Sequence, residues 1–558
     1  MTAGTTLLSA ALTLVMPAVA VVGPRGAAAD PADTTGAGWT TSSLDLDVKV
    51  HPQEGRLTIR ADLVVRLEGF PSSEAITLVM NSRDTIMGFD SLDAGIGTVA
   101  SLNAAVPFRQ ATRAARVKLP SAATRGDEVR IRVYASSRTT IPQFTLAADI
   151  ALASWVTVWY PIPLPVTGRS LSVAVKAPGS TRFDLPGGWR AVGNGSRVGM
   201  EERGGRTYER WVTDQPLARS FVAAPYRVFR GDANGRSVEL FLLTVDEAEA
   251  RKQSTTLAGA IAALEKRFGP YPTGGYAIAE VPAWVPGFLA ASEQGFMMAK
   301  PETFAVPGGN IPLFAHEAAH GYWGNLLTSS GPGSSFLSES ASQYGAVIAL
   351  EEMLGRNTAV DFLKFSREGY IPLQSAVGFF EVVRRGADSV AIADMENLDG
   401  MAKRIVVDSK GPWVYQMLRE LVGDDIFFAT LRSYLSNHAA GTSTLDRFRE
   451  TFAAAAPAQD VRGFFEQWLD RTGAPRFEVE WRDAGAEVEV TLRQIQEGDA
   501  YAVRAEILVR GSEGPGEIHS VRIDAKEQTV RLPAPRGASE VVFDPEFKIF
   551  RWDASYQR

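Results

Sequence analysis

Two histidines and two glutamates have types and spacings that suit hydrolysis at a metal ion. His316, Glu317 and His320 form the pattern HExxH, which has apolar residues on both sides and is followed by the first Gly at Gly321. On a helix, residues four apart lie on one face, so both imidazoles can reach one cation while Glu317 lies beside them. Two ligands do not hold zinc, so a third must come from elsewhere. A second helical run that begins around Leu337 offers Glu339 for this position.

These residue types predict a catalytic site with one zinc ion. Imidazole and carboxylate suit a borderline cation, and three protein ligands leave the fourth position for water, whose pKa then falls toward neutrality. Glu317 is placed to accept the proton of that water as general base. The alternative is that HExxH arose by chance on an amphipathic helix. The chain has only five His, however, and the pattern takes two of them.

The residues around this pattern resemble a known family. HEAAHGYWGNLLT followed by FLSESASQY resembles the signature of the aminopeptidase-N-like gluzincin metallopeptidases, in which eighteen residues separate the second His from the ligand Glu. Residues 321–338 give that spacing here. The resemblance extends over residues 264–282, 409–411 and 423–476. It implies a thermolysin-like, mostly helical catalytic domain that acts on peptides as an aminopeptidase.

A second family segment is matched only in part. The family has Gly-x-Met-Glu-Asn, whose Glu binds the free amine of the substrate. Here Glu293-Gln294 stands for Glu-Asn, while Ser292 replaces Met and Ala290 replaces Gly. The resemblance implies that Glu293 binds substrate, since a buried carboxylate would pair with an α-ammonium and exclude chains without a free end. Alternatively, Glu293 caps a turn or forms a salt bridge with Lys300.

The largest departure from the family lies at Asp408. The family places a Tyr there, two residues before the Lys of residues 409–411, and its hydroxyl donates to the oxyanion. A carboxylate cannot donate unless it is protonated. Tyr370, Tyr344 or Tyr415 could reach the same space, or zinc alone could carry the charge, so we name no catalytic tyrosine. The departures leave two alternatives open: a zinc endopeptidase or non-peptide hydrolase, and a catalytically impaired binding homologue.

Partners for the metal-binding imidazoles are also needed, because each ring has a second nitrogen. Asn325 and Gln343 are polar residues at positions near His320 and Glu339 that are otherwise apolar or small, and they are candidates for this role. The three remaining histidines are interpreted as structural or surface residues: His51, His438 and His519.

The elements that must position the site form a multidomain α+β chain. Leu44, Leu46 and the following apolar residues alternate with polar ones, which predicts a β-hairpin with one solvated face. Similar short runs continue and predict an N-terminal all-β domain over residues 40–232. Helical periodicity then dominates the catalytic domain, residues 233–474. Alternation returns in residues 475–558, which we interpret as a C-terminal β-sandwich.

Composition narrows the possible partners. The 558 residues are 22% charged and carry a net charge of −7, so nothing indicates nucleic-acid binding. The chain has no Cys, which excludes disulfides and thiolate ligands. Residues 1–29 combine an apolar run with an Ala-x-Ala site, which predicts a signal peptide or N-terminal anchor. We therefore expect an exported protein that acts on peptides and has no stable membrane partner after signal cleavage.

Overall fold

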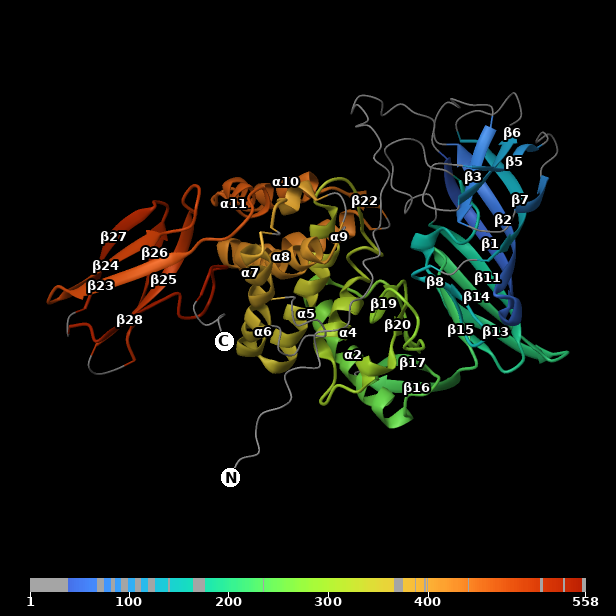
Figure 1. The fold of residues 1–558 in the computed structure, drawn as a ribbon, viewed down its shortest axis with the longest axis horizontal. Coiled ribbons are helices and arrows are strands. Elements are labelled where there is room, and N and C mark those ends of the chain that lie inside the picture. The colour runs from blue at the N-terminus through green and yellow to red at the C-terminus, as the bar shows by residue number, and fades with distance from the viewer. Residues whose placement is uncertain are drawn as a thin grey trace.

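Three parts follow one another along the long axis of the computed structural model, with strands at both ends and helices between them (Figure 1). This arrangement confirms the expected α+β architecture. The predicted signal peptide lies outside the described residues, as does Tyr370. The described residues are 39–67, 75–81, 86–91, 99–105, 112–118, 126–138, 141–163, 176–233, 235–365, 375–386, 388–395, 398, 400–439, 441–511, 515–534 and 537–553.

The N-terminal part consists of three sheets. A seven-stranded sheet has the order β13-β14-β11-β1-β2-β7-β4, and two four-stranded sheets have the orders β10-β3-β6-β5 and β12-β15-β9-β8. The predicted hairpin is confirmed: β1 pairs with β2 in antiparallel fashion, and the apolar side chains from Leu44 to Val50 are buried. The strands are β1 (Trp39–His51), β2 (Arg56–Leu67), β3 (Ala75–Asn81), β4 (Ile86–Ser91), β5 (Val99–Ala105), β6 (Thr112–Lys118), β7 (Glu128–Ser137), β8 (Phe144–Leu146), β9 (Ala151–Ala153), β10 (Ile162–Pro163), β11 (Ala177–Pro186), β12 (Arg190–Gly193), β13 (Ser196–Arg203), β14 (Arg206–Leu217) and β15 (Phe221–Ala224).

A five-stranded sheet connects this part to the helices. Its order is β16-β17-β18-β20-β19. Strand β16 falls within the predicted N-terminal domain, but it pairs with β17 along its full length, so it belongs to the sheet of the catalytic part. The strands are β16 (Arg227–Ala233), β17 (Arg236–Leu242), β18 (Tyr276–Glu280), β19 (Ala290–Glu293) and β20 (Phe296–Ala299). Glu293 thus ends the edge strand of this sheet.

The helices form the middle of the molecule and share one apolar core. Helix α2 (Glu247–Phe268) begins at the N-cap Asp246, whose carboxylate accepts a hydrogen bond from the Ala248 N–H at 2.8 Å. Glu247 and Glu249 make the first turn of this helix acidic. The other helices are α3 (Pro301–Phe304), α4 (Ile311–Ala319), α5 (Glu339–Leu354), α6 (Arg356–Phe365), α7 (Ala376–Arg384), α8 (Met401–Val422), α9 (Asp424–Asn437), α10 (Leu445–Ala455) and α11 (Val461–Leu469).

The C-terminal part is a sandwich of two three-stranded sheets, with orders β23-β24-β27 and β26-β25-β28. Its apolar side chains belong to the same core as the helices, and Trp468 packs on Tyr501 with ring centroids 5.0 Å apart. The expected β-sandwich is therefore confirmed. The strands are β23 (Phe477–Asp483), β24 (Glu487–Gln494), β25 (Val503–Arg510), β26 (Glu517–Ile523), β27 (Glu527–Pro533) and β28 (Glu540–Phe543).

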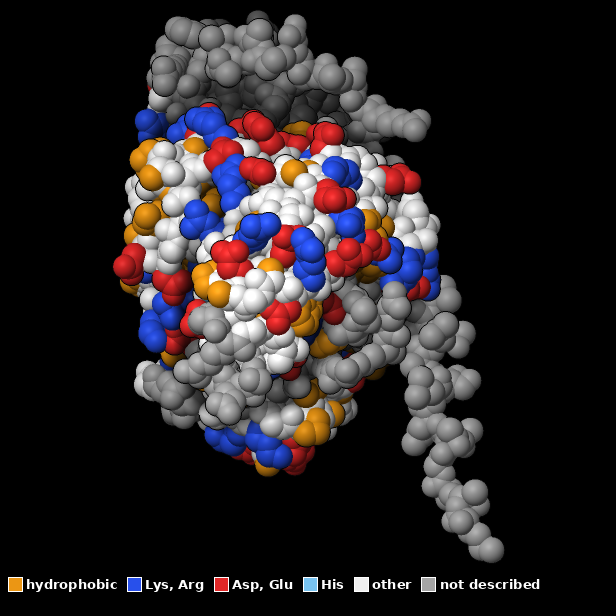
Figure 2. Space-filling view, turned by 90° about the vertical axis from the view of Figure 1, so that its left-hand side faces the viewer, with side chains coloured by type: hydrophobic (Ala, Val, Ile, Leu, Met, Phe, Trp, Pro, Cys, Tyr) orange, Lys and Arg blue, Asp and Glu red, His pale blue; other side chains and the backbone are white. Residues whose placement is uncertain are grey.

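The surface at the C-terminal end mixes charges of both signs. Basic and acidic side chains are interspersed over this face, with scattered apolar groups between them (Figure 2). Within the described residues, no helix combines the length and the apolar character needed to cross a bilayer.

Candidate metal centre and cleft

The HExxH residues lie on α4, a short and fully buried helix. Asn310 caps its N-terminus by accepting a hydrogen bond from the Leu313 N–H at 3.4 Å. The regular helix ends at Ala319, and His320 follows as the C-cap with right-handed helical angles. Because His320 keeps the helical conformation, its ring stays on the same face as that of His316. The two Nε2 atoms are 3.1 Å apart.

Glu339 completes the group from the first turn of α5. Its Oε2 lies 3.7 Å from the Nε2 atom of His316 and 3.7 Å from that of His320. The three donor atoms all lie within 4.8 Å of one another. The structure therefore brings together the three residues that the sequence nominated as metal ligands.

The electrostatics of this group suit a divalent cation. Burial lowers the pKa of His320 to about 4, so this ring is neutral, the form that binds metal. Burial also opposes ionisation of Glu339, but its interactions with the two imidazoles and with the Arg404 guanidinium outweigh burial and hold the pKa of Glu339 well below its usual range. Burial opposes protonation of His316, but its hydrogen bond with Glu339 and the nearby carboxylates of Glu317 and Asp408 raise the pKa of His316 to about 8, so a bound cation would take the place of this proton. A largely buried site that holds several carboxylates favours positive charge between the donors.

The second nitrogen of each imidazole has a partner that orients the ring. Nδ1 of His316 lies 2.8 Å from Oε1 of Gln343, which confirms one predicted partner. Nδ1 of His320 lies 3.0 Å from the Trp323 carbonyl and 2.9 Å from the Ser342 hydroxyl. These contacts turn both Nε2 atoms toward the common point. The prediction for Asn325 was wrong, because Ser342 and a backbone carbonyl fill that place.

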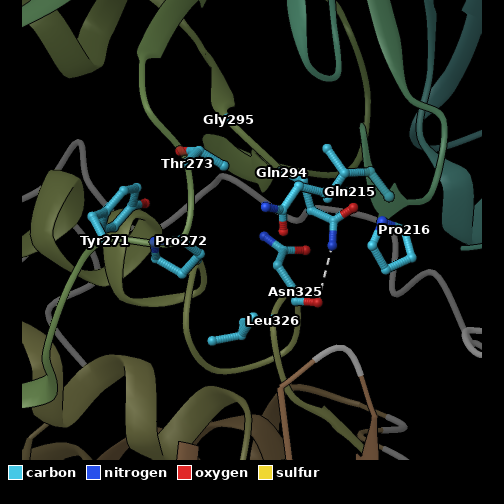
Figure 3. A pocket seen from close by; sticks show the side chains of 11 residues that line it. Gln215, Pro216, Tyr271, Pro272, Thr273, Gln294, Gly295, Asn325 and Leu326 are labelled. Atoms are coloured by element: carbon cyan, nitrogen blue, oxygen red, sulfur yellow. Dashed lines mark hydrogen bonds between the residues drawn. The ribbon is translucent and has the colours of Figure 1, made fainter. Parts of the chain in front are cut away.

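Asn325 instead belongs to a buried polar network behind α4. Its backbone carbonyl accepts hydrogen bonds from Gln294 Nε2 at 3.0 Å and from Lys176 Nζ at 2.6 Å. Figure 3 shows the Gln294 contact across a small cavity between the sheet and the loop after α4. Asn194 donates to the Gln294 carbonyl at 2.9 Å. The network fixes the segment that carries Glu293, and its members come from parts of the chain that sequence reasoning did not connect.

Glu317 and Glu293 both face the cleft, and burial changes the ionisation of each. Burial raises the pKa of Glu317 to about 7 and the pKa of Glu293 to about 7. Ser292 donates a backbone hydrogen bond to Glu317, and Ser220 donates its hydroxyl to Glu293 Oε2 at 2.6 Å. Among the described residues, no ion pair joins Glu293 to Lys300, so that alternative is excluded. Glu293 is buried with its carboxylate at the cleft wall.

The cleft that contains these groups has a volume of about 580 Å³, which is within the usual range of ligand sites. Segments from the N-terminal part, the β19 hairpin, α4, α5 and α8 all contribute to its walls. The lining residues are Gln143, Ser154, Trp155, Val156, Gly287, Phe288, Leu289, Ala290, Ala291, Ser292, Glu293, His316, Glu317, His320, Gly324, Asn325, Thr328, Ser329, Ser338, Glu339, Met401 and Arg404. Glu293 and the three residues of the metal-binding group therefore line one and the same cleft.

Two of the tyrosines considered from the sequence, Tyr344 and Tyr415, do not reach this cleft. The Tyr344 hydroxyl donates to Gln416 Oε1 at 3.0 Å, and the Tyr415 hydroxyl donates to the Phe336 carbonyl at 3.2 Å. Both are buried in the core and neither lines the cleft. Asp408 is also buried, and its Oδ2 lies 3.6 Å from Nε of Arg404. Sequence reasoning missed Arg404, although it lies one helical turn before Asp408.

The site has the make-up of a metallopeptidase. Helix α4 carries His316 and His320 with Glu317 beside the first histidine, and α5 carries Glu339. The Peptidase family M1 domain matches residues 293–468. The resemblance of these residues to the aminopeptidase-N-like metallopeptidases is therefore confirmed.

Proteins with similar sequences include bacterial aminopeptidases. Aminopeptidase N of Lactococcus lactis subsp. lactis is 27% identical over 172 residues, which are 29% of this chain and 19% of that protein. Aminopeptidase N of Lactobacillus helveticus is 26% identical over 173 residues, with the same coverage of 29% and 19%. The matched region thus spans about a fifth of the length of these relatives.

The fold has a counterpart among solved structures. Aminopeptidase A of Legionella pneumophila, determined in complex with aspartic acid, is similar with a TM-score of 0.66 at 14% sequence identity. The similarity covers 93% of this chain and 60% of that protein. At this identity the match establishes the fold alone.

Proposed function

We propose that the chain is a zinc-dependent metallopeptidase that removes residues from the amino ends of peptides. The observation that carries the proposal is the convergence of His316, His320 and Glu339 on one point of a cleft that also holds Glu317 and Glu293. Metal ligands alone support hydrolysis of many substrates. The added buried carboxylate of Glu293 favours a substrate with a free amine.

The residues present fit a single zinc ion. Two imidazole nitrogens and one carboxylate oxygen form the donor set of a catalytic zinc with an open fourth position. The contacts of His316 with Gln343 and of His320 with Ser342 hold the rings in place for such an ion. When bound, zinc supplies Lewis acidity toward a water molecule and a carbonyl group.

Glu317 is the proton carrier of the proposed reaction. A water oxygen attacks the carbonyl carbon, the carbonyl π pair moves onto its oxygen, and the Glu317 carboxylate accepts a proton from the water. When the carbon–nitrogen bond breaks, the pair returns to form the product carboxyl, and Glu317 donates its proton to the leaving amine. The buried position of Glu317 at the cleft and its contact with Ser292 orient the carboxylate for both transfers.

Glu293 sets the direction in which a peptide binds. Its carboxylate is held by Ser220 at 2.6 Å and lines the same cleft as the metal-binding group. A charge-assisted hydrogen bond to an α-ammonium would place the first peptide bond of the substrate near Glu317. An acetylated amino end cannot donate in this way and would leave the buried carboxylate with hydroxyl partners such as Ser220 but no positive charge beside it. The geometry thus favours an aminopeptidase over an endopeptidase.

Paired peptides test this proposal. Purified full-length protein is loaded with zinc and incubated with a peptide library whose members carry free or acetylated amino ends. Stepwise loss of residues from free ends only, abolished by a chelator and restored by zinc, is the expected result. Internal cleavage of acetylated peptides would contradict the exopeptidase assignment, and no cleavage of either set would contradict the enzyme assignment.

The N-terminal segment bears on where the enzyme acts. The apolar run and the Ala-x-Ala site in residues 1–29 support export of the enzyme, with peptides as its only proposed partner.

A further inference from the structure

The cleft contains one basic side chain among its described lining residues, that of Arg404 on α8. Its Nη2 atom lies 3.4 Å from Glu339 Oε2, and its Nε atom lies 3.6 Å from Asp408 Oδ2. The side chain is 47% exposed. A guanidinium thus stands beside the metal-binding group, in contact with one of its ligands and open to the cleft.

Hydrolysis of a peptide bond needs a donor at this place. Negative charge develops on the carbonyl oxygen when water attacks, and a fixed donor aimed at that oxygen stabilises the transition state. The acidic groups of the cleft, Glu293, Glu317 and Glu339, raise the energy of any additional negative charge. Tyr344 and Tyr415 are committed to contacts in the core. Arg404 is the cation that the described part of the cleft offers.

We propose that Arg404 is a catalytic residue that donates a hydrogen bond to the substrate carbonyl oxygen as the oxygen gains charge. The carbonyl π pair moves onto that oxygen while Glu317 takes the proton of the attacking water, so Arg404 stabilises charge and exchanges no proton. This inference rests on the proposed peptidase function.

Asp408 is the positioning residue for this guanidinium. The Asp408 side chain has no exposed surface and sits four residues after Arg404 on α8, so one face of the helix carries both groups. A buried carboxylate needs a charged or hydrogen-bonding partner. In this ion pair Nε lies 3.6 Å from Asp408 Oδ2, so Asp408 attracts the Nε edge of the guanidinium by its charge and not by a close hydrogen bond. At 3.4 Å the contact with Glu339 is long for a hydrogen bond, so it can be exchanged for a contact with substrate.

The first test replaces Arg404 and a matched neighbour. Arg404→Ala and Arg404→Lys are compared with Lys403→Ala. This control removes a positive charge from the residue that precedes Arg404 on α8 and does not line the cleft. We expect Arg404→Ala to lower kcat by about 10²-fold to 10³-fold with a much smaller change in KM. Added guanidinium ion should recover part of the rate, and Lys403→Ala should retain the wild-type rate. Zinc content, measured by metal analysis, should be the same in all variants.

Binding of transition-state mimics gives a readout independent of turnover. A phosphinic peptide has a tetrahedral phosphorus with charged oxygens in place of the tetrahedral carbon of the transition state. Its affinity should therefore fall in Arg404→Ala by the same factor as kcat/KM. The affinity of an uncleaved amino-acid amide should stay within about threefold of wild type, since its carbonyl oxygen is neutral. Equal losses for both ligands, or loss of zinc that accounts for the lower rate, would overturn the inference.

The role of Asp408 is tested by a double-mutant cycle. Asp408→Asn should lower kcat in the wild-type background and have little further effect in Arg404→Ala, because it acts through the guanidinium. Additive losses would overturn the positioning role. An active wild type with an equally active Arg404→Ala refutes the inference about Arg404 and leaves the peptidase proposal standing. A wild type without activity, despite full zinc loading, refutes the peptidase proposal itself.

Discussion

Replacement of Glu293 by Gln should weaken catalysis and stabilise the protein at the same time. The amide has nearly the shape of the carboxylate and can keep the Ser220 contact, so packing is preserved. It lacks the charge that pairs with an α-ammonium. A charge-assisted hydrogen bond contributes about 1.5–3 kcal/mol, so kcat/KM for free amino ends should fall by roughly 10-fold to 150-fold.

The Glu293→Gln variant should gain stability because folding raises the pKa of the wild-type carboxyl group. Burial raises the pKa of Glu293 from 4.5 to about 7, so the folded state binds this proton more tightly than the unfolded chain does. Wild-type stability is therefore lost as pH rises from about 4.5 through 7, and the lost amount approaches about 3 kcal/mol once the pKa of about 7 is passed. The Gln variant has no such proton, so its advantage should be small near pH 4.5 and near its full size above pH 8.

Two assays on the same preparations check this pair of effects. Hydrolysis of free peptides gives kcat/KM, and urea unfolding followed by tryptophan fluorescence at pH 5 and pH 8.5 gives relative stability. Glu302→Gln, at an exposed position of α3, controls for loss of one negative charge and should change neither quantity. A Glu293→Gln variant that cleaves free peptides at the wild-type rate, or whose stability advantage does not grow with pH, would refute the reasoning.

Three further perturbations address the metal centre. Glu317→Gln should reduce turnover by about 10²-fold to 10⁴-fold while zinc content stays unchanged, and metal analysis beside rate measurements checks both. Gln343→Ala removes the 2.8 Å partner of His316, so zinc affinity measured by competition with a chelator should fall by about 10-fold to 100-fold. Gly345→Ala would place a methyl group 2.4 Å from the Ala319 Cβ, because α5 and α4 touch at this glycine. It should cost about 1–3 kcal/mol in thermal or urea unfolding and loosen zinc binding; unchanged stability would contradict the close contact.

Local sequence patterns were enough to predict the metal-binding group and most of the elements that carry it. The four-residue spacing of His316 and His320 depends only on helix geometry, and the apolar alternation around Leu44 depends only on strand geometry. The partner of His316 was also predictable, since Gln343 lies four residues after Glu339 on the same helix. Each of these inferences uses the period of a single element.

The errors arise where contacts cross between elements. Asn325 looked like an imidazole partner by its distance along the chain, but the chain turns after His320 and brings Trp323 and Ser342 there instead. Strand β16 reads like the strands before it, and only its pairing with β17 assigns it to the next sheet. The sequence around Arg404 shows only a charged residue in a helical segment, so its position at the cleft could not be predicted. Its place beside Glu339 depends on how α8 packs against α5.

The carboxylates around the metal-binding group are balanced only when a metal ion and a positively charged substrate amine are both bound. Four carboxylates meet at or near the cleft, those of Glu293, Glu317, Glu339 and Asp408. Arg404 supplies one positive charge, a zinc ion would supply two, and the α-ammonium of a bound peptide would supply the fourth. A peptide with a blocked end would leave this balance one charge short in a desolvated site. In the proposed function, selection for free amino ends would therefore follow from the electrostatics of the whole cleft as well as from the single contact with Glu293.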